Sequence, residues 1–376
     1  MALPGAQRRG GWTTVKRGVG GRGGGTVEPV QELGLAPLAR AWGRPVLRVG
    51  EPMPLLGHIA FGVIDRGSNV LQVRPTTLCP LSCIFCSVDA GPASRTRQAE
   101  YIVEPGWLAD WVDMVAREKS VTVEALIDGV GDPFTYPRLV ELVALLKQSP
   151  MVHSVAAETH GATLTRRLVD RLEEAGLDRI NLSIDTLDPE KAKKLTATPW
   201  YNVEHVREIA EYIARETSID LHVTPVWLPG VNDQDVVEII EWAYRIGAGK
   251  RWPPVTVQKY VAHRRGRHPP GVREPSWSEY WRWLRELEER TGKRLTWTME
   301  EWGMRHAPRV RNPLPRGSRT VLQVAGPGWQ HGELLAVATR EKRVVTLVNA
   351  RWAKPGQLVP ARITHDKDGI LIARPL

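Results

Sequence analysis

Cysteine is almost absent from this chain, since only three occur among its 376 residues. All three lie in the stretch Cys-Pro-Leu-Ser-Cys-Ile-Phe-Cys, as Cys79, Cys83 and Cys86. An odd number of thiols with no secretory signal before them argues against a disulfide framework. No Cys or His follows before His153, so a closed four-ligand zinc site is not favoured either. Buried apolar cysteines gathered by chance remain an alternative, but the tight spacing favours a shared ligand for three soft thiolates.

The sequence also lacks an apolar run of membrane-spanning length and an apolar N-terminal leader with a cleavage site. We therefore expect a cytoplasmic protein without a membrane partner, in a reducing compartment that suits an oxygen-sensitive metal centre. Apolar residues make up 42% of the chain. That share and this length allow a large catalytic domain with a small additional one.

Acidic residues are missing from residues 1–25, which hold five Lys or Arg. They are also few in residues 316–376, where ten Lys or Arg face four Asp or Glu. The net charge of +9 therefore lies in these two segments, and the residues between them carry −2. Such a distribution is expected of a protein that holds a phosphate backbone. A solvated surface in a basic proteome is the alternative.

The C-x3-C-x2-C motif, with Phe85 before its last cysteine, resembles the cluster-binding motif of the radical SAM superfamily. Electron-transfer clusters usually have four cysteine ligands, so three would leave one iron open. The resemblance implies a [4Fe–4S] cluster whose fourth iron is chelated by the amino and carboxylate groups of S-adenosylmethionine. It further implies reductive cleavage to a 5′-deoxyadenosyl radical, with electrons from an external donor of the ferredoxin or flavodoxin type.

Residues 29–302 alternate between strand-like and helix-like stretches, which predicts an α/β fold with a parallel sheet. A hairpin is predicted around residues 65–68, and six βα units follow if the strand before the cysteines is counted. The resemblance implies a partial (βα)6 TIM-like barrel, with its chemistry at the carboxyl ends of the strands. The predicted strands are 70–73, 123–127, 152–157, 179–184, 219–226 and 255–260, and the predicted helices are 106–118, 137–148, 165–175, 203–215, 234–246 and 276–290.

The flanking segments differ in character from this core. Residues 1–28 are rich in Gly and Arg and predict a flexible arm, and residues 303–318 are rich in Pro and Arg and predict a linker. Residues 319–376 hold five short strand-like stretches, which predict a small all-β barrel of the OB type. This segment resembles a TRAM domain, a module of several RNA-modifying enzymes, and the resemblance implies RNA binding. A barrel used for dimerisation is the alternative.

Motifs after the second, fourth and fifth strands resemble cofactor contacts of the family. The Gly129–Pro133 segment resembles the Gly-Gly-Glu motif, whose backbone receives the methionine amine, although Asp132 stands where Glu is commoner. Ser183 and Asp185 share one side of a strand and resemble groups that bind the ribose hydroxyls or the methionine carboxylate. Leu228 begins a turn similar to one whose backbone contacts adenine. The candidate cofactor-binding residues are Phe85, Gly129, Gly131, Asp132, Pro133, Ser183, Asp185 and Leu228.

Candidate substrate contacts follow the third and sixth strands. His160 replaces the Asn of a Thr-Asn-Gly turn found in the family. The loop after the sixth strand is basic and suited to gripping substrate phosphates, since Arg binds their oxygens bidentately; a solvated surface loop is the alternative. Trp277, Trp281 and Trp283 fall around one predicted helix, which favours core packing over base stacking. The candidate substrate-binding residues are His160, Tyr260, His263, Arg264 and Arg267.

Because no cysteine lies outside the motif, this chain alone cannot ligate a second cluster or use a methyl-cysteine intermediate. A single-cluster radical SAM enzyme remains. The basic barrel favours modification of a nucleotide in tRNA or rRNA. One alternative is a radical SAM enzyme that acts on a metabolite, peptide or lipid, with the barrel used for assembly. An iron–sulfur RNA-binding protein without turnover is the other.

Overall fold

The computed structural model describes residues 12–14 and 31–376. Apart from residues 12–14, the arm expected at residues 1–28 lies outside the described residues. The described residues divide into two compact units, each built from separate stretches of chain. The sheet unit takes residues 59–95 and 105–312, and the barrel unit takes residues 12–14, 31–58, 96–104 and 313–376.

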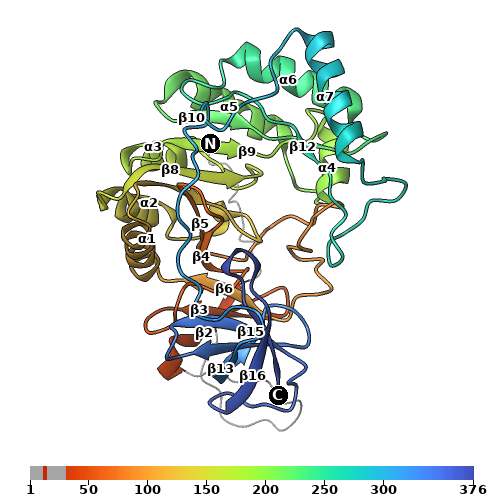
Figure 1. Ribbon diagram of the computed structural model, residues 1–376. Helices are drawn as coiled ribbons and strands as arrows, with labels where there is room; N and C mark the ends of the chain where they lie inside the picture. Colours follow the sequence, from red (N-terminus) through yellow and green to blue (C-terminus); the bar gives the residue numbers. More distant parts are fainter. Residues whose placement is uncertain (1–11, 15–30) are drawn as a thin grey trace, which may run out of the picture. The chain divides into compact units, whose positions relative to one another are not determined.

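The centre of the sheet unit is a six-stranded sheet in the order β10-β9-β8-β7-β5-β4 (Figure 1). Strands β5 to β10 of this sheet are parallel, whereas β4 pairs antiparallel with β5 across the predicted hairpin. Because neighbouring parallel strands follow each other in the chain, their carboxyl ends meet along one edge. The bounds are β4 (Gly62–Asp65), β5 (Val70–Arg74), β7 (Val123–Ile127), β8 (Val152–Thr159), β9 (Arg179–Leu182) and β10 (Asp220–Val223).

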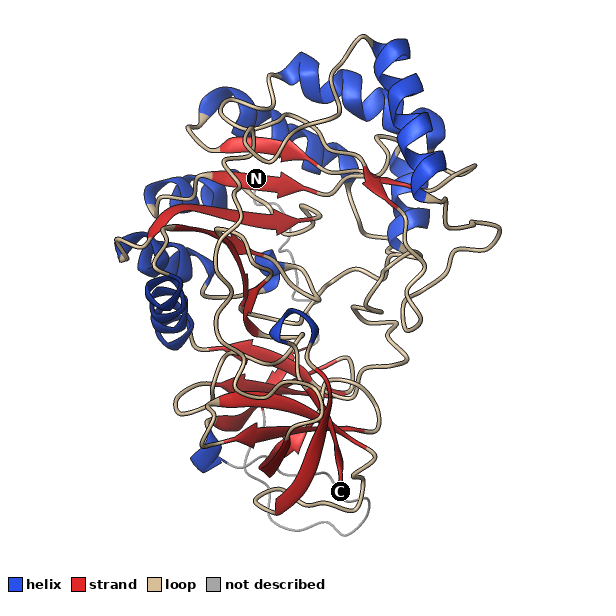
Figure 2. Ribbon diagram, viewed as in Figure 1, coloured by secondary structure: helices blue, strands red, loops and turns tan. Residues whose placement is uncertain are grey.

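Helices connect these strands and lie along the outer side of the sheet (Figure 2). Their first turns are fixed by side-chain caps; Thr165, Asn202 and Ser276 each accept a hydrogen bond from a backbone N–H three residues on. The bounds are α1 (Pro105–Lys119), α2 (Leu139–Gln148), α3 (Arg166–Glu174), α4 (Pro189–Thr196), α5 (Val203–Glu216), α6 (Asp233–Ile246) and α7 (Trp277–Thr291). Within residues 12–14 and 31–376, none of the helices combines the length and the apolarity that a bilayer crossing requires.

The predicted sixth strand is shorter than expected and pairs with the main sheet only through a single bridge between Val223 and Val255. Only β12 (Gln258–Lys259) forms, and it pairs with β11 (Val226–Trp227) in a sheet of two strands. Pro225 interrupts the fifth predicted strand, and Pro253 and Pro254 precede the sixth, so ladder donors are missing on both sides. The main sheet therefore has five parallel strands, and β11 and β12 extend it only in part.

Residues 303–312, predicted as part of a linker, are held against the sheet unit. Asn69 N–H donates to the carbonyl of Arg305 at 3.0 Å, and Val310 N–H donates to the Asp65 carboxylate at 2.8 Å. Proline keeps this segment from forming a helix, but its backbone groups find partners at the β4–β5 turn. The expected linker is therefore packed chain along its first ten residues.

The last five strands close into a barrel in the order β13-β14-β15-β17-β16. All five predicted strands form, and the apolar side chains that alternate along them fill the interior, among them Leu322, Val324, Val345, Val359 and Ile363. β15 pairs in parallel with β17, and the other pairs are antiparallel. The bounds are β13 (Arg319–Pro327), β14 (Glu333–Ala338), β15 (Arg343–Val348), β16 (Leu358–His365) and β17 (Ile372–Pro375).

The barrel unit extends well beyond residues 319–376, which differs from the expected boundaries. It includes a second sheet of β1 (Trp12–Thr14), β2 (Leu35–Ala41), β3 (Arg44–Val49) and β6 (Glu100–Val103). The Tyr101 hydroxyl donates to the carbonyl of Pro327 at 2.9 Å, and the Arg97 guanidinium lies 4.9 Å from the Trp329 ring centroid. Side chains from residues 96–104 thus join the barrel strands, which no composition shift in the sequence indicates.

Candidate active site

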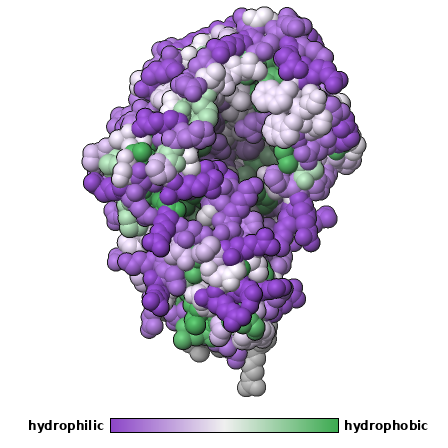
Figure 3. Space-filling model, in the orientation of Figure 1, coloured by the Kyte–Doolittle hydropathy of each residue, from purple (hydrophilic) through white to green (hydrophobic). Residues whose placement is uncertain are grey.

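A cavity of about 400 Å³ opens in the sheet unit where the parallel strands end. The space-filling view shows it as a hollow with a largely hydrophilic rim (Figure 3). Its lining comes from the cysteine loop, from the segments that follow β7, β8 and β9, and from β12 and the basic loop after it. The structure therefore brings most of the predicted motifs to one place.

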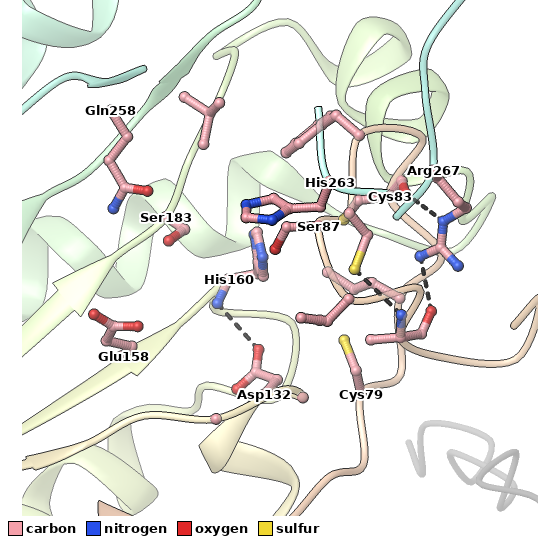
Figure 4. A pocket seen from close by; sticks show the side chains of 18 of the residues that line it. Cys79, Cys83, Ser87, Asp132, Glu158, His160, Ser183, Gln258, His263 and Arg267 are labelled. Carbon is pink, nitrogen blue, oxygen red and sulfur yellow. Dashed lines mark hydrogen bonds between the residues drawn. The ribbon is translucent and has the colours of Figure 1, made fainter. Parts of the chain in front are cut away.

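All three cysteines line this cavity, and Figure 4 shows Cys79 and Cys83 on the same side of it as Arg267. Burial raises the pKa of Cys83 well above its usual value, and the neighbouring Cys79 and Cys86 raise it further. Three crowded thiols of this kind cannot all be thiolates without a metal to take up the charge. The Ala90 N–H donates a hydrogen bond to Cys86 Sγ at 3.2 Å.

The donor set suits an iron–sulfur cluster, because soft thiolates are the ligands that such clusters take. In a cubane cluster each thiolate binds a different iron. The residues Cys79, Cys83 and Cys86 therefore suit a [4Fe–4S] cluster with one iron free of protein ligands.

Arg267, expected to grip substrate, lines the cavity and also holds the cysteine loop in place. Its guanidinium donates to the carbonyl of Cys83, to the Asp89 carboxylate and to the carbonyl of Ala90, each at 2.7 Å. Its backbone N–H also donates to the carbonyl of Cys86 at 2.8 Å. Three of its side-chain hydrogen bonds go to the protein, so Arg267 supports the cluster loop, and its contact with substrate stays a prediction.

The glycine motif packs on the segment before Cys79. A Cβ atom at Gly131 would overlap the carbonyl oxygen of Leu78, and one at Gly129 would lie 3.1 Å from the carbonyl oxygen of Thr76. Both glycines and Pro133 line the cavity. Glycine is thus required at position 131 for close approach of two backbone segments, in addition to any cofactor contact.

The Asp132 carboxylate faces the protein, although the residue lines the cavity. It accepts hydrogen bonds from the Thr159 hydroxyl and the His160 N–H at about 3.0 Å, and from the Phe134 N–H at 2.9 Å. The dashed line between Asp132 and His160 in Figure 4 marks one of these. Asp132 therefore joins the segment after β7 to the one after β8, and only its backbone remains for a cofactor.

The two strand residues expected to share a role lie in different surroundings. Ser183 lines the cavity, where its hydroxyl is 3.2 Å from that of Thr224. Asp185 does not line it; its buried carboxylate accepts the Val226 N–H at 2.8 Å, and burial raises its pKa. Strand alternation predicted that Ser183 and Asp185 lie on one side. Because β9 already ends at Leu182, that alternation does not apply to them.

Leu228, expected to offer its backbone to adenine, is fully buried and does not line the cavity. Its N–H donates to the Asn232 side chain at 2.8 Å, and its carbonyl accepts from the Val231 N–H at 2.9 Å. The turn is closed upon itself by Asn232, so the expected adenine contact at Leu228 is not supported by this geometry.

The remaining predicted residues divide between the cavity and the surface. Phe85, His160, Tyr260 and His263 line the cavity, whereas Arg264 is exposed and does not. The Tyr260 hydroxyl lies 3.4 Å from the His268 ring, and the carbonyl of His160 accepts the Tyr201 hydroxyl at 2.8 Å.

Two charged residues of the cavity were missed by sequence reasoning. Glu158 is the last residue but one of β8 and lies across the cavity from Cys79 and Cys83 (Figure 4). Burial, and then the nearby Asp128 carboxylate, raise the pKa of Glu158 to about 7. The Lys259 side chain is only 3% exposed and pairs with Glu274 at 2.6 Å. A charged residue at the carboxyl end of a buried parallel strand was the available signal for Glu158.

The family model described as the Radical SAM superfamily matches residues 73–243, the stretch from the end of β5 to α6. The chain belongs to the radical SAM superfamily. It is 34% identical over 351 residues to an uncharacterised protein of Methanocaldococcus jannaschii, covering 88% of this chain and 80% of the relative.

Other relatives match only part of the chain. A GTP 3′,8-cyclase of Chlorobaculum tepidum is 29% identical over 176 residues, or 47% of this chain and 50% of the relative. One from Streptomyces coelicolor is 31% identical over 197 residues, or 50% and 52%. The chain thus spans about half the length of these cyclases. Among solved structures, Streptococcus suis SuiB bound to S-adenosylmethionine matches 60% of this chain and 48% of its own, at 18% identity and a TM-score of 0.44.

Membership of this superfamily implies a [4Fe–4S] cluster and S-adenosylmethionine, and the three cysteines are the residues that would hold the cluster. When bound, the pair supplies a carbon-centred radical able to take a hydrogen atom from an unactivated position. The protein's own contribution is positional: Arg267 supports the cysteine loop and Asp132 joins the strand ends.

Proposed function

We propose that this radical SAM enzyme modifies a nucleotide in tRNA or rRNA. One feature of the barrel unit carries the proposal. Arg319 on β13 is directly opposite Arg362 on β16, which is in turn opposite Arg374 on β17. Opposite residues of antiparallel strands point to the same face. Because Arg319 and Arg374 are exposed and Arg362 is half-buried, the three guanidinium groups form one row on the outside of the barrel.

This arginine row is not neutralised by the protein. In the described part of the chain, no carboxylate pairs with Arg319, Arg362 or Arg374. Like charges directly opposite each other in a sheet are destabilising, so the row costs stability unless an anion binds there. A guanidinium group binds phosphate oxygens bidentately. A sugar–phosphate backbone supplies several phosphates in sequence and therefore suits a row better than a single anion does.

The surroundings of the row fit a TRAM-like, RNA-binding role for the barrel. Val321 and Leu358, which are 52% and 62% exposed, lie on the same strands as Arg319 and Arg362. Exposed apolar side chains beside cations can contact sugars and bases without adding repulsion. We infer that the barrel docks RNA while the cavity of the sheet unit receives the target nucleotide, with electrons from a ferredoxin- or flavodoxin-type donor.

A free purine nucleotide is the second candidate substrate. It is favoured by the similarity of about half of this chain to proteins named GTP 3′,8-cyclase and by a cavity of about 400 Å³, a volume in the range of small-molecule sites. In that case the barrel would serve assembly, and RNA would not affect turnover.

The test is anaerobic. The cluster is reconstituted, dithionite and S-adenosylmethionine are added, and 5′-deoxyadenosine is quantified with bulk tRNA, with rRNA, with GTP or with no addition. We expect RNA to stimulate cleavage, and we expect the triple variant Arg319→Gln, Arg362→Gln, Arg374→Gln to lose most of that stimulation. Arg340→Gln, an exposed arginine outside the row, is the matched control. Stimulation by GTP alone would favour the second candidate, and no cleavage by a fully loaded cluster would refute the enzyme assignment.

A further inference from the structure

Two tryptophans of α7 are exposed to solvent, contrary to the core packing expected for them. Trp277 is 60% exposed and Trp281 is 43% exposed. They lie one helical turn apart, with ring centroids separated by 6.4 Å and ring planes tilted by 25°. Only Trp283 packs as expected, stacked on Trp227 at 3.9 Å. The buried side of the helix is formed by Tyr280, Leu284 and Leu287, so positions 277 and 281 point away from it.

These two tryptophans, which we call the tryptophan shelf, are held rigidly. The Tyr280 ring makes edge contacts with Trp277 at 5.7 Å and with Trp281 at 5.1 Å. The Tyr280 hydroxyl donates to the carbonyl of Val257 at 2.6 Å. The helix start beneath the shelf is closed by a capping box between Ser276 and Glu279. A binding partner would therefore meet two aromatic faces that lose little conformational freedom on contact.

The shelf adjoins the cavity. Lys259 lines the cavity, and its ammonium group lies 5.1 Å from the centroid of the Trp277 ring. Trp277 is therefore separated from the cavity by one side chain. In the space-filling view, a pale patch of intermediate hydropathy borders the hollow over the region of α7 (Figure 3). A molecule that enters the cavity can contact the shelf at the same time.

Cations lie beside the shelf. Two acids near the start of the helix are already engaged, Glu274 with Lys259 at 2.6 Å and Glu279 with Arg273 at 2.6 Å. Arg282 and Arg285 are exposed, and no carboxylate of the described residues pairs with either. Arg285 lies one turn after Trp281, four residues on along the same side of the helix. Flat aromatic faces beside unpaired cations are the combination by which proteins bind unpaired nucleotides.

We propose that the tryptophan shelf stacks an unpaired base of the RNA next to the nucleotide that enters the cavity. This rests on the proposed function, since it names the contact that holds the strand flanking the target. A second copy of the chain is a poorer occupant. The exposed parts of the two indoles amount to roughly 250 Å², far below the roughly 800 Å² per partner of a stable interface. Stacking needs only the area of one base per ring.

The experiment uses the full chain with its reconstituted cluster. Its probes are a fluorescein-labelled short oligoadenylate, an abasic ribose-phosphate oligomer of the same length, and bulk tRNA. Wild-type protein should bind the oligoadenylate more tightly than the abasic oligomer. The double variant Trp277→Leu, Trp281→Leu should weaken oligoadenylate binding about tenfold or more, because loss of base–aromatic stacking costs about 1–3 kcal/mol per base. Its binding of the abasic oligomer and the salt dependence of binding should not change.

The controls separate this proposal from the proposed function. Met114→Ala removes an apolar side chain of α1 with 45% exposure and should leave oligoadenylate binding unchanged. The variant Trp277→Phe, Trp281→Leu, which has an aromatic ring at position 277 in place of the leucine, should give back most of the binding that the double variant loses. If wild-type protein binds neither tRNA nor oligoadenylate, the RNA function itself is refuted. If it binds both and the leucine variant does so equally well, only the shelf is refuted. A change in sedimentation from dimer to monomer in that variant would assign the shelf to self-association instead.

Discussion

The Nε atom of Arg267 donates a hydrogen bond to the carbonyl oxygen of Cys83 at 2.7 Å, across 184 residues of sequence. The same guanidinium binds Asp89 and the carbonyl of Ala90. An arginine from the loop after β12 therefore supports the conformation of the cysteine loop. Lysine has neither the planar fork nor the reach to make three such bonds.

We expect Arg267→Lys to lower cluster occupancy after reconstitution about twofold or more and to speed cluster loss in air. Iron and sulfide per chain, with the absorbance of the cluster over time, measure both effects. Arg264→Lys is the matched control, because Arg264 is exposed and does not line the cavity. Equal loading and equal lifetime in the two variants would contradict this role for Arg267.

Gly131→Ala should displace the segment that leads into Cys79. The added methyl group would overlap the backbone of Leu78 and Thr77, and neither backbone can move without moving the cysteine loop. Overpacking of this kind costs about 1–3 kcal/mol, so we expect a lower melting temperature together with reduced iron content. Gly106→Ala is the control, since no atom lies within 4 Å of its added Cβ and a helical alanine is about 0.5–1 kcal/mol more favourable than glycine. Similar melting temperatures for both variants would argue against the packing described here.

Glu158 predicts a pH dependence of stability. Its pKa is raised from 4.5 to about 7 in the folded protein, so the folded state keeps a proton that the unfolded chain releases. This contribution to stability is fully present below about pH 4.5 and is lost as the pH rises through about 7. Calorimetry of wild type and Glu158→Gln over this range should therefore show the variant gaining in relative stability as pH increases, then a constant difference. If the difference in stability between wild type and Glu158→Gln does not vary with pH, the Glu158 carboxylate is hydrated and this prediction is wrong.

Replacing Arg362 should raise the stability of the folded protein and lower its affinity for RNA. Removing the middle guanidinium of the arginine row relieves two unfavourable cross-strand pairs, so Arg362→Gln should raise the melting temperature slightly at low salt, and less at high salt. The same change should weaken tRNA binding and reduce the slope of log Kd against log salt by about one. Filter binding over a salt series, beside melting curves in the same buffers, tests both. A variant with lower stability and unchanged salt slope would show that the row does not meet phosphates.

Local sequence signals predicted the elements with strong periodicity well. The hairpin around residues 65–68, the strand Val123–Ile127 and the five strands of the barrel all formed where they were expected. Apolar alternation and turn residues decide such elements within a few neighbours. The cysteines, Gly131, His160 and Ser183 also meet at one cavity, because parallel strands bring their carboxyl ends together whatever the details of the loops.

The features that the sequence did not indicate are contacts between distant segments. Nothing in the sequence around Arg267 indicates that its side chain donates to the carbonyls of Cys83 and Ala90. Residues 303–312 have a linker's composition, yet their backbone is held by hydrogen bonds. The Asp65 carboxylate accepts one from this segment, and the Asn69 N–H donates one to it. Trp277 and Trp281 follow a helical spacing that fits core packing. The face of α7 that is buried is decided by distant partners, since Trp227 stacks on Trp283 and the Val257 carbonyl binds the Tyr280 hydroxyl.

The barrel unit is assembled from stretches of chain that are made at very different times. Its β2, β3 and β6 precede or interrupt the sheet unit, and its barrel strands come last. During synthesis, residues 31–58 and 96–104 therefore emerge long before their partners exist, while the sheet unit can be completed once residue 312 has left the ribosome. Maturation of the cysteine loop can thus begin on a chain whose barrel unit is still unfinished. A truncation at residue 318 would leave those early segments permanently without the strands they pack against.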